Sequence, residues 1–182
     1  PVRPVPQLLD GHSLYRRVTL TPSMCGHNYL FVAQVADWTW DTVSTTCGTD
    51  MYHEKNGSGL PTYLSFFYLR IFGGPAIQMH HFTFGDVIDV VTSAFNFGTE
   101  SMLTLHRIAR ASGDGASPRP VDPFEFYERP DDSCLYVESL NRGTRRSRLA
   151  SNEALVKSSP ARIAASHLPV LPDRYAPGLS YD

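Results

Sequence analysis

The stretch DWTWDTVSTTCG at residues 37–48 decides the fold that this sequence predicts. Trp40, Val43 and Cys47 recur at the spacing of one helical face. Asp37 is a suitable N-cap for this helix, and the closing glycine favours a stop at its C-terminus. Tryptophan, threonine and valine have poor helix propensity, so a helix of this composition needs other elements packed around it. We therefore predict a buried helix here, not a surface helix.

The segments on both sides of this helix favour extended structure. The apolar stretch at residues 30–35 is a strand or a lead-in to the helix. The predicted strands cover residues 15–20, 62–72, 86–97, 101–110 and 134–140. A short glycine-led connection joins the third and fourth of these strands, which predicts a hairpin. An antiparallel sheet wrapped around one buried helix is the hot-dog fold, in the α+β class, and its open face tends to pair with a second copy.

Length and composition fit one domain with a tail at each end. The chain has 182 residues and a net charge of -2, which argues against a generic nucleic-acid binder. We assign residues 1–12 to an N-terminal arm, residues 13–160 to the hot-dog domain and residues 161–182 to a proline-rich tail or linker that wraps over the surface. No apolar run reaches the roughly 20 residues of a membrane helix, and no secretory signal is evident. Three widely spaced cysteines do not fit a disulfide framework, so we expect a cytoplasmic protein.

The sequence carries no motif of the common cofactor enzymes. It has no P-loop, GxGxxG, HExxH, GxSxG or CxxC pair, so we expect neither a tightly bound cofactor nor a metal. His80 and His81 are adjacent and would point to opposite faces of a strand. His106 lies mid-strand with no nearby carboxylate to orient it, so we interpret it as a structural histidine. His53, just after the helix, keeps dehydration as a minor alternative.

Two groups of side chains could contact a substrate. The cluster Arg142, Arg145, Arg146 and Arg148 is dense enough to bind the phosphates of coenzyme A or an acidic carrier protein, although a solvated rim would have the same composition. Tyr63 stands at the start of the aromatic strand. A phenol with a pKa of about 10 is a poor unassisted nucleophile and a better hydrogen-bond donor, so chemistry alone does not rank it above other tyrosines.

Six stretches are more specific than composition alone. They read DWTWDTV at 37–43, CGTD at 47–50, GLPTYLSFFY at 59–68, FGD at 84–86, ESMLTLHR at 100–107 and SNE at 151–153. In this order, over most of residues 15–170, the sequence resembles the LnmK-like bifunctional acyltransferase/decarboxylases of polyketide biosynthesis, in their N-terminal hot-dog half. The tryptophan-rich helix and the Leu-Pro-x-Tyr-Leu-Ser-Phe strand are the specific parts.

The resemblance implies an enzyme of acyl thioesters with a double hot-dog fold. Such enzymes decarboxylate methylmalonyl-CoA and deliver propionyl to the phosphopantetheine arm of an acyl carrier protein. The family's proposed catalytic tyrosine matches Tyr63, as an acyl-carrying nucleophile or as a hydrogen-bond donor. Decarboxylation needs a water-poor pocket and donors on the thioester oxygen. Trp38, Trp40 and Phe66 could line that pocket, although most such rings belong to a core, and the helix N-terminus could add backbone donors.

The sequence holds one hot-dog unit, whereas the family has two in tandem. We therefore expect a second hot-dog unit as partner, either another copy of this chain or a separate half. Two other functions stay open. The first is a hot-dog thioesterase or dehydratase acting on carrier-bound acyl chains. The second is a non-catalytic domain that binds a carrier protein.

Overall fold

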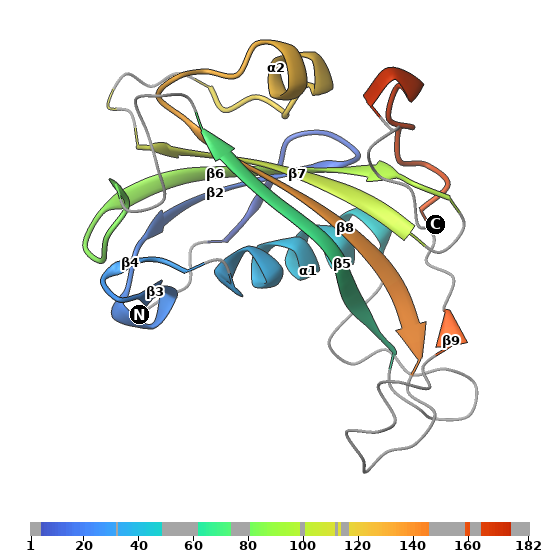
Figure 1. Cartoon of the computed structure of the whole chain (residues 1–182), viewed down its shortest axis with the longest axis horizontal. Coiled ribbons are helices and arrows are strands. Elements are labelled where there is room, and N and C mark those ends of the chain that lie inside the picture. Colours follow the sequence, from blue (N-terminus) through green and yellow to red (C-terminus); the bar gives the residue numbers. More distant parts are fainter. Residues whose placement is uncertain are drawn as a thin grey trace.

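A curved antiparallel sheet separates two helices (Figure 1). The computed structural model describes residues 5–31, 33–48, 62–73, 81–98, 101–111, 113, 117–145, 159–160 and 165–175. Its strands are β1 (Gln7–Leu8), β2 (Ser13–Thr19), β3 (Cys25–Gly26), β4 (Tyr29–Leu30), β5 (Thr62–Gly73), β6 (Val87–Asn96), β7 (Ser101–Arg110), β8 (Leu135–Arg145) and β9 (Ser159–Pro160). The helices are α1 (Ala33–Cys47) and α2 (Pro123–Glu128), with single 3₁₀ turns at Pro22–Met24 and Asp173–Tyr175. The main sheet has the order β1-β2-β6-β7-β8-β5, and β9 pairs with β8.

The predicted strands are confirmed, with shifted ends. β6 and β7 pair antiparallel as the predicted hairpin. β8 runs on to Arg145 rather than ending near residue 140, because its last residues continue to pair with β5. The main sheet with α1 on one face is the hot-dog fold in the α+β class, as the sequence predicts.

α1 is longer and less enclosed than the sequence predicts. It begins at Ala33, so the interpretation of Asp37 as the N-cap is wrong, and Asp37 lies inside the helix on its exposed side. Val35 explains the earlier start, because it is 2% exposed and packs in the core one half-turn before Asp37. The helix ends at Cys47, and Gly48 follows it as the predicted stop, with a φ of 63° that suits glycine. Thr45 is exposed as well, so the described residues bury one face of α1 and leave the other open.

Alternate residues of the strands supply two cores on opposite faces of the sheet. On the face that carries α1, Trp38 packs with Val90. On the other face, here called the outer face, Phe126 of α2 packs with Val91 and Leu105. The neighbours Val90 and Val91 thus serve different cores, as the period of two along a strand requires.

The C-terminal tail contributes to both cores, so the prediction that it only wraps over a surface is wrong. Leu168 packs in a cluster with Val43 of α1, and Leu171 packs in the outer-face cluster. Both leucines are 3% exposed. The tail is held in place where the backbone N–H of Asn96 donates to Pro169 O at 2.8 Å. Burial of the two leucine side chains stabilises the folded chain through the hydrophobic effect, and the proline-rich composition of the tail does not indicate this contribution.

The sequence prediction also omits α2. Its N-cap is Asp122, whose side chain accepts a hydrogen bond from the Phe124 N–H at 2.8 Å, and Pro123 follows at the first position. Asp-Pro is a common start of a helix, so the signal was present in the sequence. The Ser-Asn-Glu stretch at residues 151–153 lies outside the described residues.

Candidate functional site

Tyr63 lies at the start of β5, at one edge of the main sheet. The structure describes its backbone, which stands in register with Thr144 of β8. The next residue, Leu64, is 3% exposed and packs with Val43 and Cys47 near the end of α1. Within the described residues β5 pairs with β8 only, so its other edge carries no strand. The beginning of β5 and the C-terminal half of α1 therefore form one wall of the candidate site.

The aromatic residues expected near the substrate lie in three different environments. Trp38 is 2% exposed and belongs to the core. Trp40 is half-buried and packs against the cluster that contains Leu64. Phe66 is 37% exposed on β5. The structure thus brings Trp40 to the wall that begins at Tyr63, while Trp38 faces the interior.

The arginines expected to bind phosphate are only partly covered by the structure. Arg142 is half-buried on β8, in register with Ser65 of β5 and Ser101 of β7. Arg145 is the last residue of β8, and its backbone pairs with Thr62. Arg146 and Arg148 lie outside the described residues, as do His53 and His80.

His106 is a structural histidine, as predicted. It is fully buried on β7 beneath α1, with Thr39 Oγ1 3.1 Å from its Nε2 and Thr92 Oγ1 2.7 Å from its Nδ1. Burial, with the positive charge of Arg16 nearby, lowers its pKa to about 3, so the ring is neutral. We call Thr39, Thr92 and His106 the polar seat of α1.

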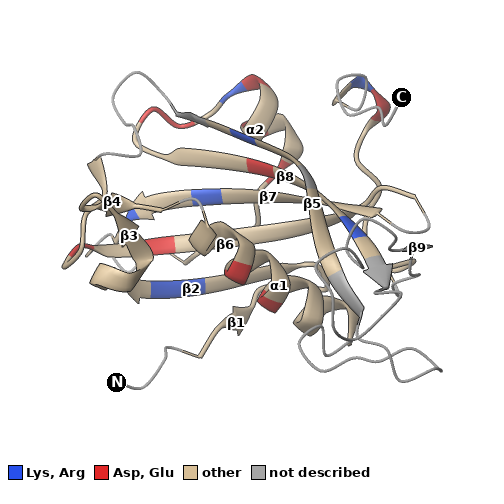
Figure 2. Cartoon of the chain, turned by 60° about the horizontal axis from the view of Figure 1, so that its bottom comes forward, with Lys and Arg blue, Asp and Glu red and all other residues tan. Residues whose placement is uncertain are grey.

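Other polar groups extend the polar seat across the sheet. Thr104 Oγ1 lies 3.5 Å from Thr39 Oγ1 and accepts a hydrogen bond from Asn141 Nδ2 at 3.2 Å. At the side of the helix, Arg16 Nη1 donates to Asp41 Oδ2 at 3.0 Å. Arg16 Nη2 is buried and has no hydrogen-bond partner among the described residues. Two kinds of polar contact therefore hold α1, one beneath it and one at its flank. Figure 2 shows acidic residues on α1 and basic residues on β2, the strand that supplies Arg16.

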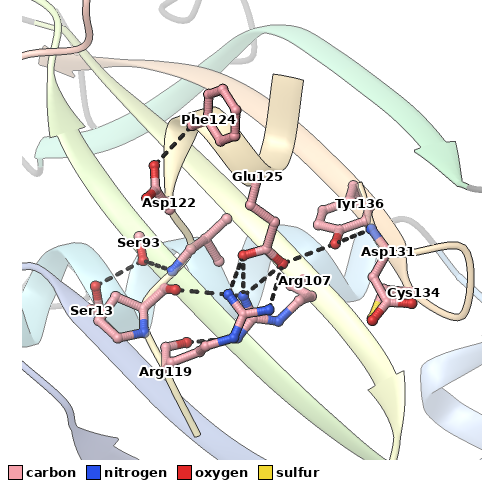
Figure 3. Close-up of polar contacts among 12 residues, drawn as sticks. Ser13, Ser93, Arg107, Arg119, Asp122, Phe124, Glu125, Asp131, Cys134 and Tyr136 are labelled. Carbon is pink, nitrogen blue, oxygen red and sulfur yellow. Dashed lines mark hydrogen bonds and ion pairs between the residues drawn. The ribbon is translucent and has the colours of Figure 1, made fainter. Parts of the chain in front are cut away.

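A second polar cluster lies on the outer face and fixes α2 (Figure 3). Glu125 is 9% exposed and accepts hydrogen bonds from Arg107 Nη1 at 3.1 Å and Tyr136 Oη at 3.0 Å. Arg107 also donates to the carbonyl oxygens of Arg119 and Pro120, at 2.6 and 3.5 Å, which holds the loop before α2 on the sheet. Burial is the main reason why the pKa of Tyr136 is raised. These groups satisfy one another, so the cluster is structural.

Neighbouring tyrosines complete the attachment of α2. Tyr127 donates to the buried carboxylate of Glu138, which also accepts from Arg70 Nε at 3.1 Å. Burial, followed by the bond to Glu138, raises the pKa of Tyr127. Tyr127 stacks on Tyr175 of the tail with 4.6 Å between ring centroids. Reasoning from the sequence missed these contacts, because each joins residues from different elements, Tyr127 and Glu138 being 11 positions apart and Arg70 and Glu138 being 68.

The described part of the chain has neither a cluster of metal-ligating side chains nor a helix suited to crossing a membrane. In that part, no three His, Cys, Asp or Glu side chains gather closely enough to hold a metal ion. The helices that the structure describes lack the length and apolar character to cross a membrane. Cys25, Cys47 and Cys134 are thiols that form no disulfide, and burial raises the pKa of each.

Comparison with known proteins identifies a family for the sequence and solved structures with a similar fold. The family model described as "LnmK N-terminal Hot Dog Fold domain" matches residues 15–181. Among solved structures, a mutant of 4-hydroxybenzoyl CoA thioesterase complexed with 4-hydroxybenzoyl CoA has a TM-score of 0.53 at 8% identity, covering 83% of this chain and 92% of its own.

Two further structures have similar scores. The 4-hydroxybenzoyl CoA thioesterase from Pseudomonas sp. strain CBS-3 has a TM-score of 0.51 at 9% identity, covering 90% of this chain and 96% of its own. The Dynemicin thioesterase has a TM-score of 0.50 at 10% identity, covering 88% and 99%. At these identities the likeness is one of fold. The curated proteins contain no match to this sequence.

Proposed function

Because the chain belongs to the family of LnmK N-terminal hot-dog fold domains, we propose that it decarboxylates methylmalonyl-CoA and transfers propionyl to an acyl carrier protein in polyketide biosynthesis. The observation that carries the proposal is the family match over residues 15–181, which includes the Leu-Pro-x-Tyr-Leu-Ser strand with Tyr63. The packing of Leu64 against α1 supports it, because this contact sets the strand of Tyr63 beside the helix that carries Trp40.

In this mechanism Tyr63 donates a hydrogen bond to the thioester oxygen. The bond from the α-carbon to the carboxylate breaks, CO₂ leaves, and the electron pair is delocalised as an enolate onto the thioester oxygen. A fixed donor stabilises that charge most in a water-poor site. The α-carbon then takes up one proton from solvent, which gives a propionyl thioester. The phosphopantetheine thiol then takes the propionyl group, and coenzyme A leaves as the thiol.

Apolar side chains beside Tyr63 disfavour the charged carboxylate of the substrate. Trp40 and Phe66 are the candidates for this role, because Trp40 is half-buried against the cluster that contains Leu64 and Phe66 is 37% exposed. Trp38 is assigned to the core and not to the pocket in this proposal, since it is 2% exposed. No tightly bound cofactor takes part in the scheme.

A second hot-dog unit, supplied by another copy or by a separate half, completes the site in this proposal. Among the described residues β5 is a long edge strand, and Phe66 and Leu69 on it are 37% and 36% exposed. Long apolar edge strands without a neighbour are prone to pairing with another chain. We propose that the second unit lies along β5, next to Tyr63. The arginines at the end of β8 and after it (Arg142, Arg145, Arg146, Arg148) would contact the phosphates of coenzyme A or of the carrier protein's phosphopantetheine.

The test incubates the protein with methylmalonyl-CoA and a holo carrier protein, followed by mass spectrometry of both. Loss of CO₂ together with propionyl on the carrier is the expected result. Loss of water would indicate a dehydratase, free acid a thioesterase, and carrier binding without turnover a non-catalytic module. Each of these three outcomes overturns the proposal.

The role of Tyr63 is tested by Tyr63→Phe, which should abolish propionyl transfer and leave the folded structure unchanged by circular dichroism. Tyr29→Phe on β4 is the matched control, because Tyr29 is an exposed phenol that the proposal gives no role. Full turnover by Tyr63→Phe would remove Tyr63 from the mechanism.

A further inference from the structure

The middle of α1 rests on the polar seat, whereas Val35 near its start and Val43 and Cys47 near its end pack in apolar clusters. Thr39, Thr92 and His106 are 0%, 2% and 0% exposed. Both ring nitrogens of His106 have a hydroxyl within 3.1 Å, so Thr39 on the helix is tied through the imidazole to Thr92 on β6. Hydrogen bonds require a defined distance and direction, while apolar packing is non-directional. The polar seat is therefore the contact that specifies one orientation of α1.

Thr39 stands between the two tryptophans of the chain, and this position makes the orientation matter. Successive residues of an α-helix are about 100° apart around its axis, so Trp38 and Trp40 project to either side of Thr39. With Thr39 directed at His106, Trp38 enters the core with Val90. Trp40 is directed to the other flank, against the cluster that contains Leu64. A rotation of α1 about its own axis would change the burial of the Trp38 and Trp40 rings.

We propose that His106 is a positioning residue: through Thr39 it fixes the rotation of α1 and so holds Trp40 beside the start of β5. This inference rests on the proposed function, in which Tyr63 at the start of β5 and Trp40 serve the acyl thioester. The ion pair of Arg16 and Asp41, at the flank of the helix, also restrains the rotation of α1. His106 does not touch the substrate in this scheme.

The first test compares Thr39→Val with Thr39→Ser. Valine keeps the shape of threonine and removes the hydroxyl, which leaves a buried imidazole nitrogen without its partner. Misplacement of catalytic groups by about 1 Å costs on the order of 100-fold in rate, so we expect kcat for propionyl transfer to fall by about 10- to 100-fold in Thr39→Val. Thr39→Ser should stay near the wild type. Equal kcat in all three proteins, even with lower stability of Thr39→Val, would overturn the inference.

The second test reads the helix rotation without relying on activity. In a Trp40→Phe background Trp38 is the remaining tryptophan, because the chain has two. At 2% exposure its fluorescence should resist quenching by acrylamide. Adding Thr39→Val should raise the quenching constant several-fold, and adding Thr39→Ser should not. Unchanged quenching in Thr39→Val would overturn the inference.

Failure of the proposed function gives a different pattern. If the wild-type chain with a holo carrier protein and methylmalonyl-CoA shows no decarboxylation, the proposed function fails, and the quenching experiment still decides whether the polar seat sets the rotation of α1. His106→Gln is the second variant for both readouts, should Thr39→Val fail to fold. It should give the same loss of kcat and the same rise in quenching.

Discussion

His106→Gln should remove a specific part of the protein's sensitivity to acid. In the folded protein burial lowers the pKa of His106 to about 3, whereas an unfolded chain gives histidine a pKa of about 6.5. Below pH 6.5 the unfolded state therefore binds a proton that the folded state does not. By linkage, the contribution of His106 to stability is complete above pH 6.5 and is lost as the pH falls from 6.5 towards 3.

The size of this loss follows from the two pKa values. One pKa unit corresponds to about 1.4 kcal/mol, so a fall from pH 7 to pH 5 should lower the free energy of unfolding by about 2 kcal/mol through His106 alone. Glutamine does not titrate, so the variant lacks this component. The remaining histidines and the carboxylates are the same in both proteins and cancel in the difference.

Urea denaturation at pH 7 and at pH 5 measures the effect. The wild type should lose about 2 kcal/mol more than His106→Gln between the two values of pH. The absolute stability of the variant at pH 7 does not enter, since each protein serves as its own reference. Equal losses in the two proteins would refute the reasoning, because they would mean that His106 is either accessible to solvent or charged in the folded state.

Two further predictions concern stability on the outer face and in the tail, each measured by chemical denaturation. Two guanidinium groups pair with the Glu125 carboxylate: the buried Arg107, and the exposed Arg119, whose Nη1 lies 2.5 Å from Oε2. Arg107→Met should lower the free energy of unfolding by about 3 kcal/mol, because it removes the buried cation and leaves the carbonyl oxygens of Arg119 and Pro120 without their donor. Arg119→Met should cost no more than about 1 kcal/mol, because its side chain is 60% exposed. Similar costs for both would show that Glu125 is not buried as described. Leu168→Ala should lower the free energy of unfolding by about 2–5 kcal/mol, because the side chain is buried. Val170 lies two residues later and is 71% exposed, so Val170→Ala should change the free energy of unfolding by no more than about 0.5 kcal/mol. A tail that only lies over the surface would give two small values.

The strands were predictable because their signals are local. Alternating side chains and the glycine-led connection between β6 and β7 need no knowledge of the rest of the chain. The helix was predictable in kind but not in extent. Its start depends on Val35 finding a place in the core, and a capping preference at Asp37 cannot outweigh that burial.

The polar seat was harder to predict, although part of its signal is visible. Thr39, Thr42 and Thr46 have the same i, i+3, i+7 spacing as Trp40, Val43 and Cys47, and they form the centre of the buried face. Thr42 and Thr46 satisfy their hydroxyls on the helix itself, each donating to the carbonyl four residues earlier at 2.7 Å. The sequence does not reveal that Thr39 pairs instead with His106, 67 positions further along.

Only the part of the candidate site that depends on local sequence could be predicted. The aromatic strand and its order after the helix are local features, and they place Tyr63 on β5. Which tryptophan is buried depends on the rotation of α1, which contacts between distant residues determine. Nothing local distinguishes Trp38 from Trp40.

The place of Leu168 and Leu171 has a consequence for synthesis on the ribosome. Each leucine completes a different one of the two cores, and both lie more than twenty residues after the end of β8. A nascent chain that has already exposed every strand of the main sheet still shows apolar surface on both faces. Folding should therefore remain incomplete until this late segment has left the exit tunnel, and ribosome-bound intermediates should be open to chaperones until then.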